Sequence, residues 1–202
     1  VSVPVGENDE EALQQLVRDN VLREVSGRYL PEQDLLEDWA LIRYINDTFM
    51  EHSDNPPTFF SSIGEEPAMR RSFRMWLVEM LGKPETVVFN DFITTSLKNE
   101  SLSQYWRDGI IIAVLSTDKA ENYISQQKDK LLENDAALLM RMIHLLRVGC
   151  KFPDEKMLET LGLTEYGKKF MSLMFLKPKG SGWASIIKFV YANIDKIDFK
   201  ML

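Results

Sequence analysis

The chain has 202 residues, of which 45% are apolar and 27% charged, so it has the composition of an ordinary globular protein and enough length to bury a core. Its formal charge of −7 disfavours general adhesion to nucleic acid or to an acidic membrane surface. Cys150 is the only cysteine, which excludes an internal disulfide and favours a reducing compartment, so we expect a cytoplasmic protein.

The N-terminal part predicts two helices separated by a short extended piece. Apolar residues at three- and four-residue spacings indicate a helix over 10–25. The segment RYLPE (28–32) is strand-like, and its proline restricts it to the edge of a sheet. A second helix is expected over 33–50, with Asp34 near its positively polarised amino end.

The clearest interruption follows this second helix. Residues 51–67 are rich in Pro, Ser, Asn and Gly, and we assign 53–64 to a loop. The adjacent Phe59 and Phe60 favour a loop that packs on the body of the protein rather than a free linker.

Beyond this loop, helices follow one another at short intervals. They are expected over 65–81, 83–97, 103–116, 119–134, 136–150, 154–161, 165–176 and 183–194. This succession predicts an all-α architecture, and its hairpin-like spacing favours stacked helix pairs, an irregular HEAT-like α-solenoid, over a four-helix bundle. The tryptophans lie within amphipathic helices, so we expect most of them in the core: Trp39, Trp76, Trp106 and Trp183.

The segment GLTEYGKKF (162–170) has the spacing of glycines and lysine found in phosphate-binding loops. The residues before it fit a short helix better than the buried strand that such a loop requires, and Lys169 stands where a Ser or Thr would hold Mg²⁺. Gly162 is expected to end one helix and Thr164 to cap the next. We therefore predict a corner between two helices rather than a nucleotide site.

No other pattern of catalytic, cofactor-binding or metal-binding residues stands out in the sequence. Two histidines and one cysteine are too few for a typical His/Cys metal site. We therefore expect no catalytic residues, no cofactor and no metal, and hence a chain that is not itself an enzyme.

Two groups of cationic residues are candidate sites for binding a partner. The first lies on one side of a helix and suits an acidic partner or a phosphate: Arg70, Arg71 and Arg74. Its alternative role is an ion-pair network within the chain, with Glu65, Glu66 and Glu79. The second group is the densest basic cluster: Lys168, Lys169, Lys177 and Lys179.

The stretch LVRDNVLREVSGRYLPEQDLLEDWALIRYI (16–45) resembles a segment of bacterial STAND-type ATPases, the signal-transduction ATPases with numerous domains. In that family a winged helix follows an AAA+-like nucleotide module and leads into a phrase like F-x-H-D-x-x-x-D-W-A, after which helical repeats begin. Residues in matching places are Tyr29, Asp34, Asp38, Trp39 and Ala40, whereas Gln33 replaces the His of the pattern. The segment 65–81 is similar to the arginine-rich R-x-F-x-x-W-L helix that comes next.

The resemblance implies a winged-helix remnant and a long connecting helix over 1–52, and a helical-repeat arm over 65–202, without the ATPase module. Asp34, Asp38 and Trp39 would then join the two subregions. The implied function is that of a non-catalytic regulatory or scaffold segment of a larger ATPase-linked signalling protein. Its partners would be proteins, either its own ATPase module or a signalling partner, rather than nucleic acid or a membrane.

Two alternatives remain open. The half of the chain over 102–202 carries 15 Lys/Arg and 12 Asp/Glu, so a HEAT-like module that binds nucleic acid through its lysines is one of them. The other is a helical enzyme, such as a hydrolase, with a site assembled from scattered carboxylates.

Overall fold

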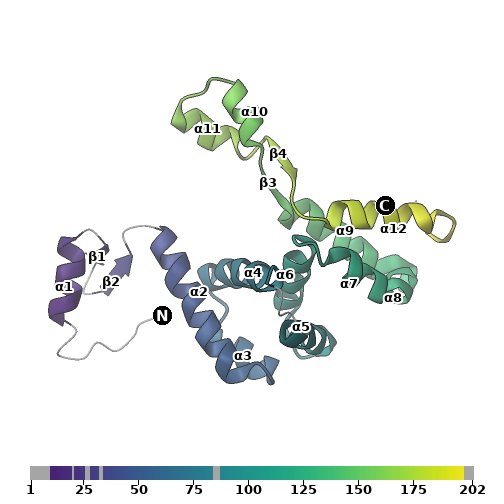
Figure 1. The fold of residues 1–202 in the computed structure, drawn as a ribbon, viewed down its shortest axis with the longest axis horizontal. Helices are drawn as coiled ribbons and strands as arrows, with labels where there is room; N and C mark the ends of the chain where they lie inside the picture. The colour runs from purple at the N-terminus through teal and green to yellow at the C-terminus, as the bar shows by residue number, and fades with distance from the viewer. Residues whose placement is uncertain (1–9, 20, 26–27, 32–33, 84–86, 198–202) are drawn as a thin grey trace. The chain divides into compact units, whose positions relative to one another are not determined.

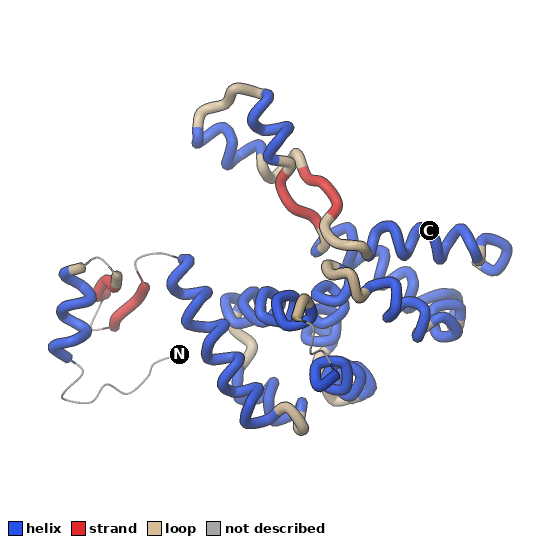
Figure 2. The backbone as a smooth tube through the Cα atoms, in the orientation of Figure 1, coloured by secondary structure: helices blue, strands red, loops and turns tan. Residues whose placement is uncertain are grey.

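The computed structural model is mostly helical, as the sequence predicts (Figures 1 and 2). It describes residues 10–19, 21–25, 28–31, 34–83 and 87–197. The chain divides into two compact units, Val1–Phe73 and Arg74–Leu202. This division falls within a helix, whereas the sequence placed the change of subregion in the segment 53–64.

The first unit combines helices with a two-stranded antiparallel hairpin. Its elements in chain order are α1 (Glu10–Arg18), β1 (Leu22–Val25), β2 (Arg28–Pro31), α2 (Asp34–His52), α3 (Pro56–Ile63) and the beginning of α4 (Pro67–Leu81). The β1–β2 register runs from Leu22 opposite Pro31 to Val25 opposite Arg28. The predicted helix over 10–25 is therefore too long, because its last residues pair with β2 instead of continuing α1. In a two-stranded sheet every strand is an edge, which accommodates the proline as expected.

The loop predicted over 53–64 is wrong, because most of it forms the helix α3. The Asn55 side chain accepts a hydrogen bond from the Thr58 backbone N–H (3.3 Å) and so caps the amino end of α3. The prolines that suggested a loop occupy the first two helical positions, where a missing N–H breaks no helical hydrogen bond. Asparagine followed by proline thus begins a helix here.

The core of the first unit is aromatic. Phe59 and Phe60 are buried, as expected, and their ring centroids lie 6.1 and 5.4 Å from that of Phe73 on α4. Phe49 of α2 contacts Phe59 edge to face at 6.1 Å. These rings pack α2, α3 and the beginning of α4 together.

The second unit is built around α6, which is buried along most of its length. Its helical elements are the rest of α4, α5 (Val87–Lys98), α6 (Gln104–Leu115), α7 (Ala120–Gln126), α8 (Lys128–Leu132), the short 3₁₀ turn η1 (Asn134–Ala136), α9 (Ala137–Gly149), α12 (Gly182–Ala192) and η2 (Ile194–Lys196). Ile111 and Leu115 of α6 pack with Leu139 and Met142 of α9 and with Phe189 of α12. The helix expected over 119–134 is divided into α7 and α8.

A hairpin arm, residues 151–178, is inserted between α9 and α12 (Figure 1). It contains β3 (Lys151–Pro153), α10 (Glu155–Thr160), α11 (Glu165–Met171) and β4 (Leu176–Pro178). The two strands pair antiparallel, with Phe152 opposite Lys177, so the chain leaves α9 and returns to α12 along one ribbon. The two short helices therefore lie at the far end of a ribbon that the sequence did not predict (Figure 2).

Candidate functional site

The segment that resembles a phosphate-binding loop forms the predicted corner between α10 and α11. Gly162 has φ = 59°, a left-handed conformation that glycine adopts without strain, and follows the end of α10. The Thr164 hydroxyl accepts a hydrogen bond from the Gly167 backbone N–H (3.3 Å) and caps α11. The residues of the motif are thus used for helix termination and capping, as predicted.

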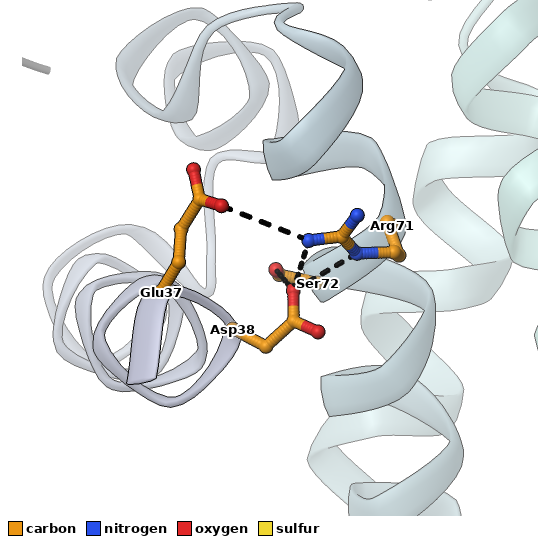
Figure 3. A network of polar contacts seen from close by, with 4 residues as sticks. All are labelled: Glu37, Asp38, Arg71 and Ser72. Atoms are coloured by element: carbon orange, nitrogen blue, oxygen red, sulfur yellow. Dashed lines mark hydrogen bonds and ion pairs between the residues drawn. The ribbon is translucent and has the colours of Figure 1, made fainter. Parts of the chain in front are cut away.

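A polar network joins α2 to α4 within the first unit (Figure 3). Arg71 of α4 donates hydrogen bonds from Nε and Nη2 to Asp38 Oδ1 of α2, at 2.9 and 2.6 Å, and the Ser72 hydroxyl donates to the same oxygen at 3.3 Å. Glu37 Oε2 lies 3.9 Å from Arg71 Nη2. The Asp38 side chain is only 16% exposed, so this is a recessed junction rather than a surface ion pair.

Of the other two residues expected at the junction, the structure describes the side chain of Trp39 alone. Trp39 is 62% exposed and is an exception to the prediction that most tryptophans lie in the core. Trp76 and Trp106 are buried, and Trp183 is half-buried and donates its indole N–H to the Cys150 carbonyl at 2.8 Å. Asp34 begins α2, and its side chain lies outside what the structure describes.

The arginines of the first cationic group contact different parts of the chain. Arg70 Nη2 lies 3.5 Å from Glu65 Oε2, which is one of the internal ion pairs considered as the alternative. Arg71 is held by Asp38, a partner 33 residues away that helical spacing does not reveal. In the second unit, the aliphatic stem of Arg74 packs over Gly109 of α6. Arg70 and Arg71 thus take part in ion pairs within the first unit.

The lysines of the second group lie on the hairpin arm or at its base. Lys168 and Lys169 belong to α11. The Nζ atom of Lys177, on β4, lies 3.5 Å from Asp154 Oδ1 and 4.7 Å from the centre of the Phe152 ring. Lys179 follows β4, and its backbone N–H donates to the Cys150 carbonyl at 2.9 Å.

The most exposed apolar surface of the arm was missed by sequence reasoning. We call it the α11 stripe: Tyr166 (87% exposed), Phe170 (64%), Leu173 (74%) and Met174 (67%). These residues are spaced i, i+4, i+7 and i+8, and hydrogen-bonded turns extend α11 as far as Phe175, so they share one side of the element. The same spacing is typical of a buried helix face, so the sequence alone does not reveal that this side of α11 is exposed.

A shallow hollow lies beside the α11 stripe. It has a volume of about 520 Å³ and is lined by Pro153 at the end of β3, by Glu155 and Leu158 of α10, and by residues of α11 and its end: Tyr166, Lys168, Lys169 and Ser172. The lining of this hollow thus combines apolar and aromatic side chains with two lysines and one glutamate.

The described residues contain neither a cluster suited to a metal ion nor a helix suited to crossing a membrane. Within the ranges given above, no cluster of three or more His, Cys, Asp or Glu is placed to hold a metal ion. Nor does any helix of that part of the chain combine the length and apolar character needed to cross a bilayer. In comparisons with known proteins, no family model matches the chain, and no curated protein matches it in sequence.

Proposed function

We propose that this chain is a helical regulatory or scaffold segment of a larger ATPase-linked signalling protein and that it works through protein–protein contacts. The observation that carries the proposal is the α11 stripe, which places four large apolar side chains in solvent at the end of a projecting ribbon. Contiguous exposed apolar surface on a small domain is typical of a binding surface.

The size of the α11 stripe suits a contact with energetic consequences. Burying a side chain such as Phe or Leu completely contributes about 1.5–3 kcal/mol, and aromatic residues are frequent among the residues that dominate binding. A helix with its own apolar face is the partner that a stripe of this spacing fits. Lys169 lines the adjoining hollow and favours an acidic residue on that partner.

The placement in a STAND-type protein is supported by the first unit. The order of α1, the β1–β2 hairpin and α2 agrees with the last helix, the wing and the connecting helix that the resemblance implies. Asp38 comes from the D-W-A phrase and Arg71 from the R-x-F-x-x-W-L phrase, and the two residues bind each other. On this proposal the helices of the second unit belong to an irregular solenoid that carries the hairpin arm.

The protein-contact proposal is tested by photo-crosslinking in the full-length protein. A photoreactive phenylalanine analogue replaces Phe170 in one sample and the exposed Glu159 of α10 in the matched control. We expect a protein crosslink from position 170 that is absent from position 159 and is lost when Tyr166 and Leu173 are changed to serine. The crosslinked segment should be helical and acidic.

Other outcomes of the same experiment overturn parts of the proposal. Equal crosslinking from both positions, or none from position 170, removes the stripe as a binding surface. A crosslink to nucleic acid instead favours the lysine-based alternative. The full open reading frame tests the placement separately, because a phosphate loop and its Mg²⁺-binding Asp encoded before Val1 would support an ATPase-linked protein and their absence would contradict it.

A further inference from the structure

A polar cleft in the second unit, lined by residues that precede the hairpin arm in the sequence, has the composition of an anion-binding site. It has a volume of about 250 Å³ and lies among α5, α6, α7, α8 and α9. The described residues that line it include the cations Lys98, Arg107, Lys130 and Arg141, and no carboxylate. These four cations come from four different helices, α5, α6, α8 and α9, which the fold brings together around one cleft.

Among the residues that the structure describes, the hydrogen bonds of Arg107 go to neutral acceptors. Its Nε donates to the Leu102 carbonyl at 2.9 Å and its Nη2 to the Glu100 carbonyl at 2.8 Å. Both acceptors are neutral backbone oxygens, so they hold the guanidinium in place while its positive charge remains. A cation fixed in this way loses little side-chain entropy when it binds an anion.

Arg141 has a different role from the other cations. It forms two hydrogen bonds with the Asp108 carboxylate, one from Nε at 3.0 Å and one from Nη2. Asp108 also accepts a hydrogen bond from Gln104 Nε2 at 2.9 Å, so one carboxylate positions two of the side chains that line the cleft. Since Asp108 offsets the charge of Arg141, the remaining positive charge comes from Lys98, Arg107 and Lys130.

The other residues that line the cleft indicate the kind of anion that would fit. Amide side chains of Gln126 and Gln127 offer neutral donors and acceptors, and Leu97, Ile111 and Leu138 provide an apolar wall. A small number of polar groups on a partly apolar wall is typical of sites for small molecules. The volume suits a compact ligand rather than a polymer.

We propose that this cleft binds a small organic anion that carries at least two phosphate or carboxylate groups. The charges of Lys98, Arg107 and Lys130 match the negative groups, and the apolar wall takes the short carbon part of the ligand. This site is independent of the α11 stripe, so it adds a ligand to a chain proposed to bind proteins.

Titration calorimetry on the whole chain tests the proposal with two probes, inorganic pyrophosphate for the phosphate class and citrate for the carboxylate class. We expect saturable binding of at least one probe with one site per chain. Lys98→Gln and Lys130→Gln should each weaken that binding about tenfold, because each removes a charge-assisted contact. Both lysines are exposed, so these variants should fold normally.

Lys128→Gln is the matched control, because Lys128 is an exposed lysine on the same helix as Lys130 that does not line the cleft. The Lys128→Gln variant should bind the probe with the same affinity as the unchanged protein. Equal weakening by Lys128→Gln and Lys130→Gln would show diffuse attraction and overturn the site. Failure of both probes to bind at about 10 mM, at low salt, would also overturn it.

Discussion

Asp38 and Arg71 are joined by two hydrogen bonds from one guanidinium group to one carboxylate oxygen, although the residues are 33 positions apart in the sequence. The contact connects α2 to α4, whose beginning belongs to the first unit, and it is recessed on the Asp38 side. A bidentate donor and a single recessed acceptor make this contact stronger than an ordinary surface ion pair.

Changing Asp38→Ala should lower the free energy of unfolding by about 1.5–3 kcal/mol, because it removes the shared acceptor of Arg71 and Ser72. Urea denaturation followed by circular dichroism measures the change. Glu37→Gln is the control, since Glu37 lies 3.9 Å from Arg71 and both side chains are nearly half exposed, and it should cost no more than about 0.5 kcal/mol. Equal effects of the two substitutions would contradict the assigned role of Asp38.

The α11 stripe should be dispensable for folding. Phe170→Ser should change the free energy of unfolding by no more than about 0.5 kcal/mol, because the side chain is mostly in solvent. Leu158→Ala on the neighbouring α10 should cost about 2 kcal/mol or more, because Leu158 is buried. Thermal unfolding of both variants distinguishes the exposed position of Phe170 from the core position of Leu158. Strong destabilisation by Phe170→Ser would mean that the stripe is covered within the chain.

The stability of the corner between α10 and α11 should depend on backbone conformation rather than on a bound ligand. Gly162→Ala should destabilise the arm by about 1 kcal/mol through the left-handed conformation alone, since an added Cβ meets no atom within 4 Å. Gly162→Asn should cost less, because asparagine tolerates this conformation better than alanine. Hydrogen exchange of the α11 amides measures both, and equal protection in all three proteins would refute the prediction.

Tyr123 should make stability fall at high pH. Burial raises the pKa of Tyr123 from its ordinary value of 10.0 to about 12. Its contribution is fully present below about pH 10; above that pH the unfolded chain loses the phenolic proton while the folded chain keeps it. Each pH unit between about 10 and 12 should therefore remove about 1.4 kcal/mol of stability.

Tyr123→Phe provides the comparison for this pH dependence, because it removes the titrating group and keeps the ring. The unfolding free energies of the two proteins should diverge progressively above about pH 10. Parallel curves in urea denaturation over this range would show that Tyr123 titrates normally in the folded state.

Much of the fold was predictable because helix periodicity is a local property. The helix α4 spans Pro67–Leu81 where 65–81 was expected, and α6 spans Gln104–Leu115 where 103–116 was expected. The Thr164 cap was predictable for the same reason, since both of its partners lie within one turn. The strand β2 was expected from the segment 28–32, but β3 and β4 were not, because they depend on each other across 22 intervening residues of chain that form two helices.

The candidate sites also contain residues that the sequence identifies and contacts that it does not reveal. The sequence identified Asp38 and Arg71 as separate members of two motifs, but their contact depends on how α2 packs beside α4. The cleft was not predicted at all, because its cations come from α5, α6, α8 and α9 and no spacing along the chain relates them.

By itself the sequence determined most of the helical segments and which side of each is apolar, because both follow from interactions among residues a few positions apart. Only the tertiary structure decided which apolar sides are covered. Phe59 and Phe170 both lie on short helices, yet the first is buried among other aromatic rings and the second faces solvent. The difference lies in the neighbouring elements, since burial depends on what packs against a side chain and not on the side chain alone.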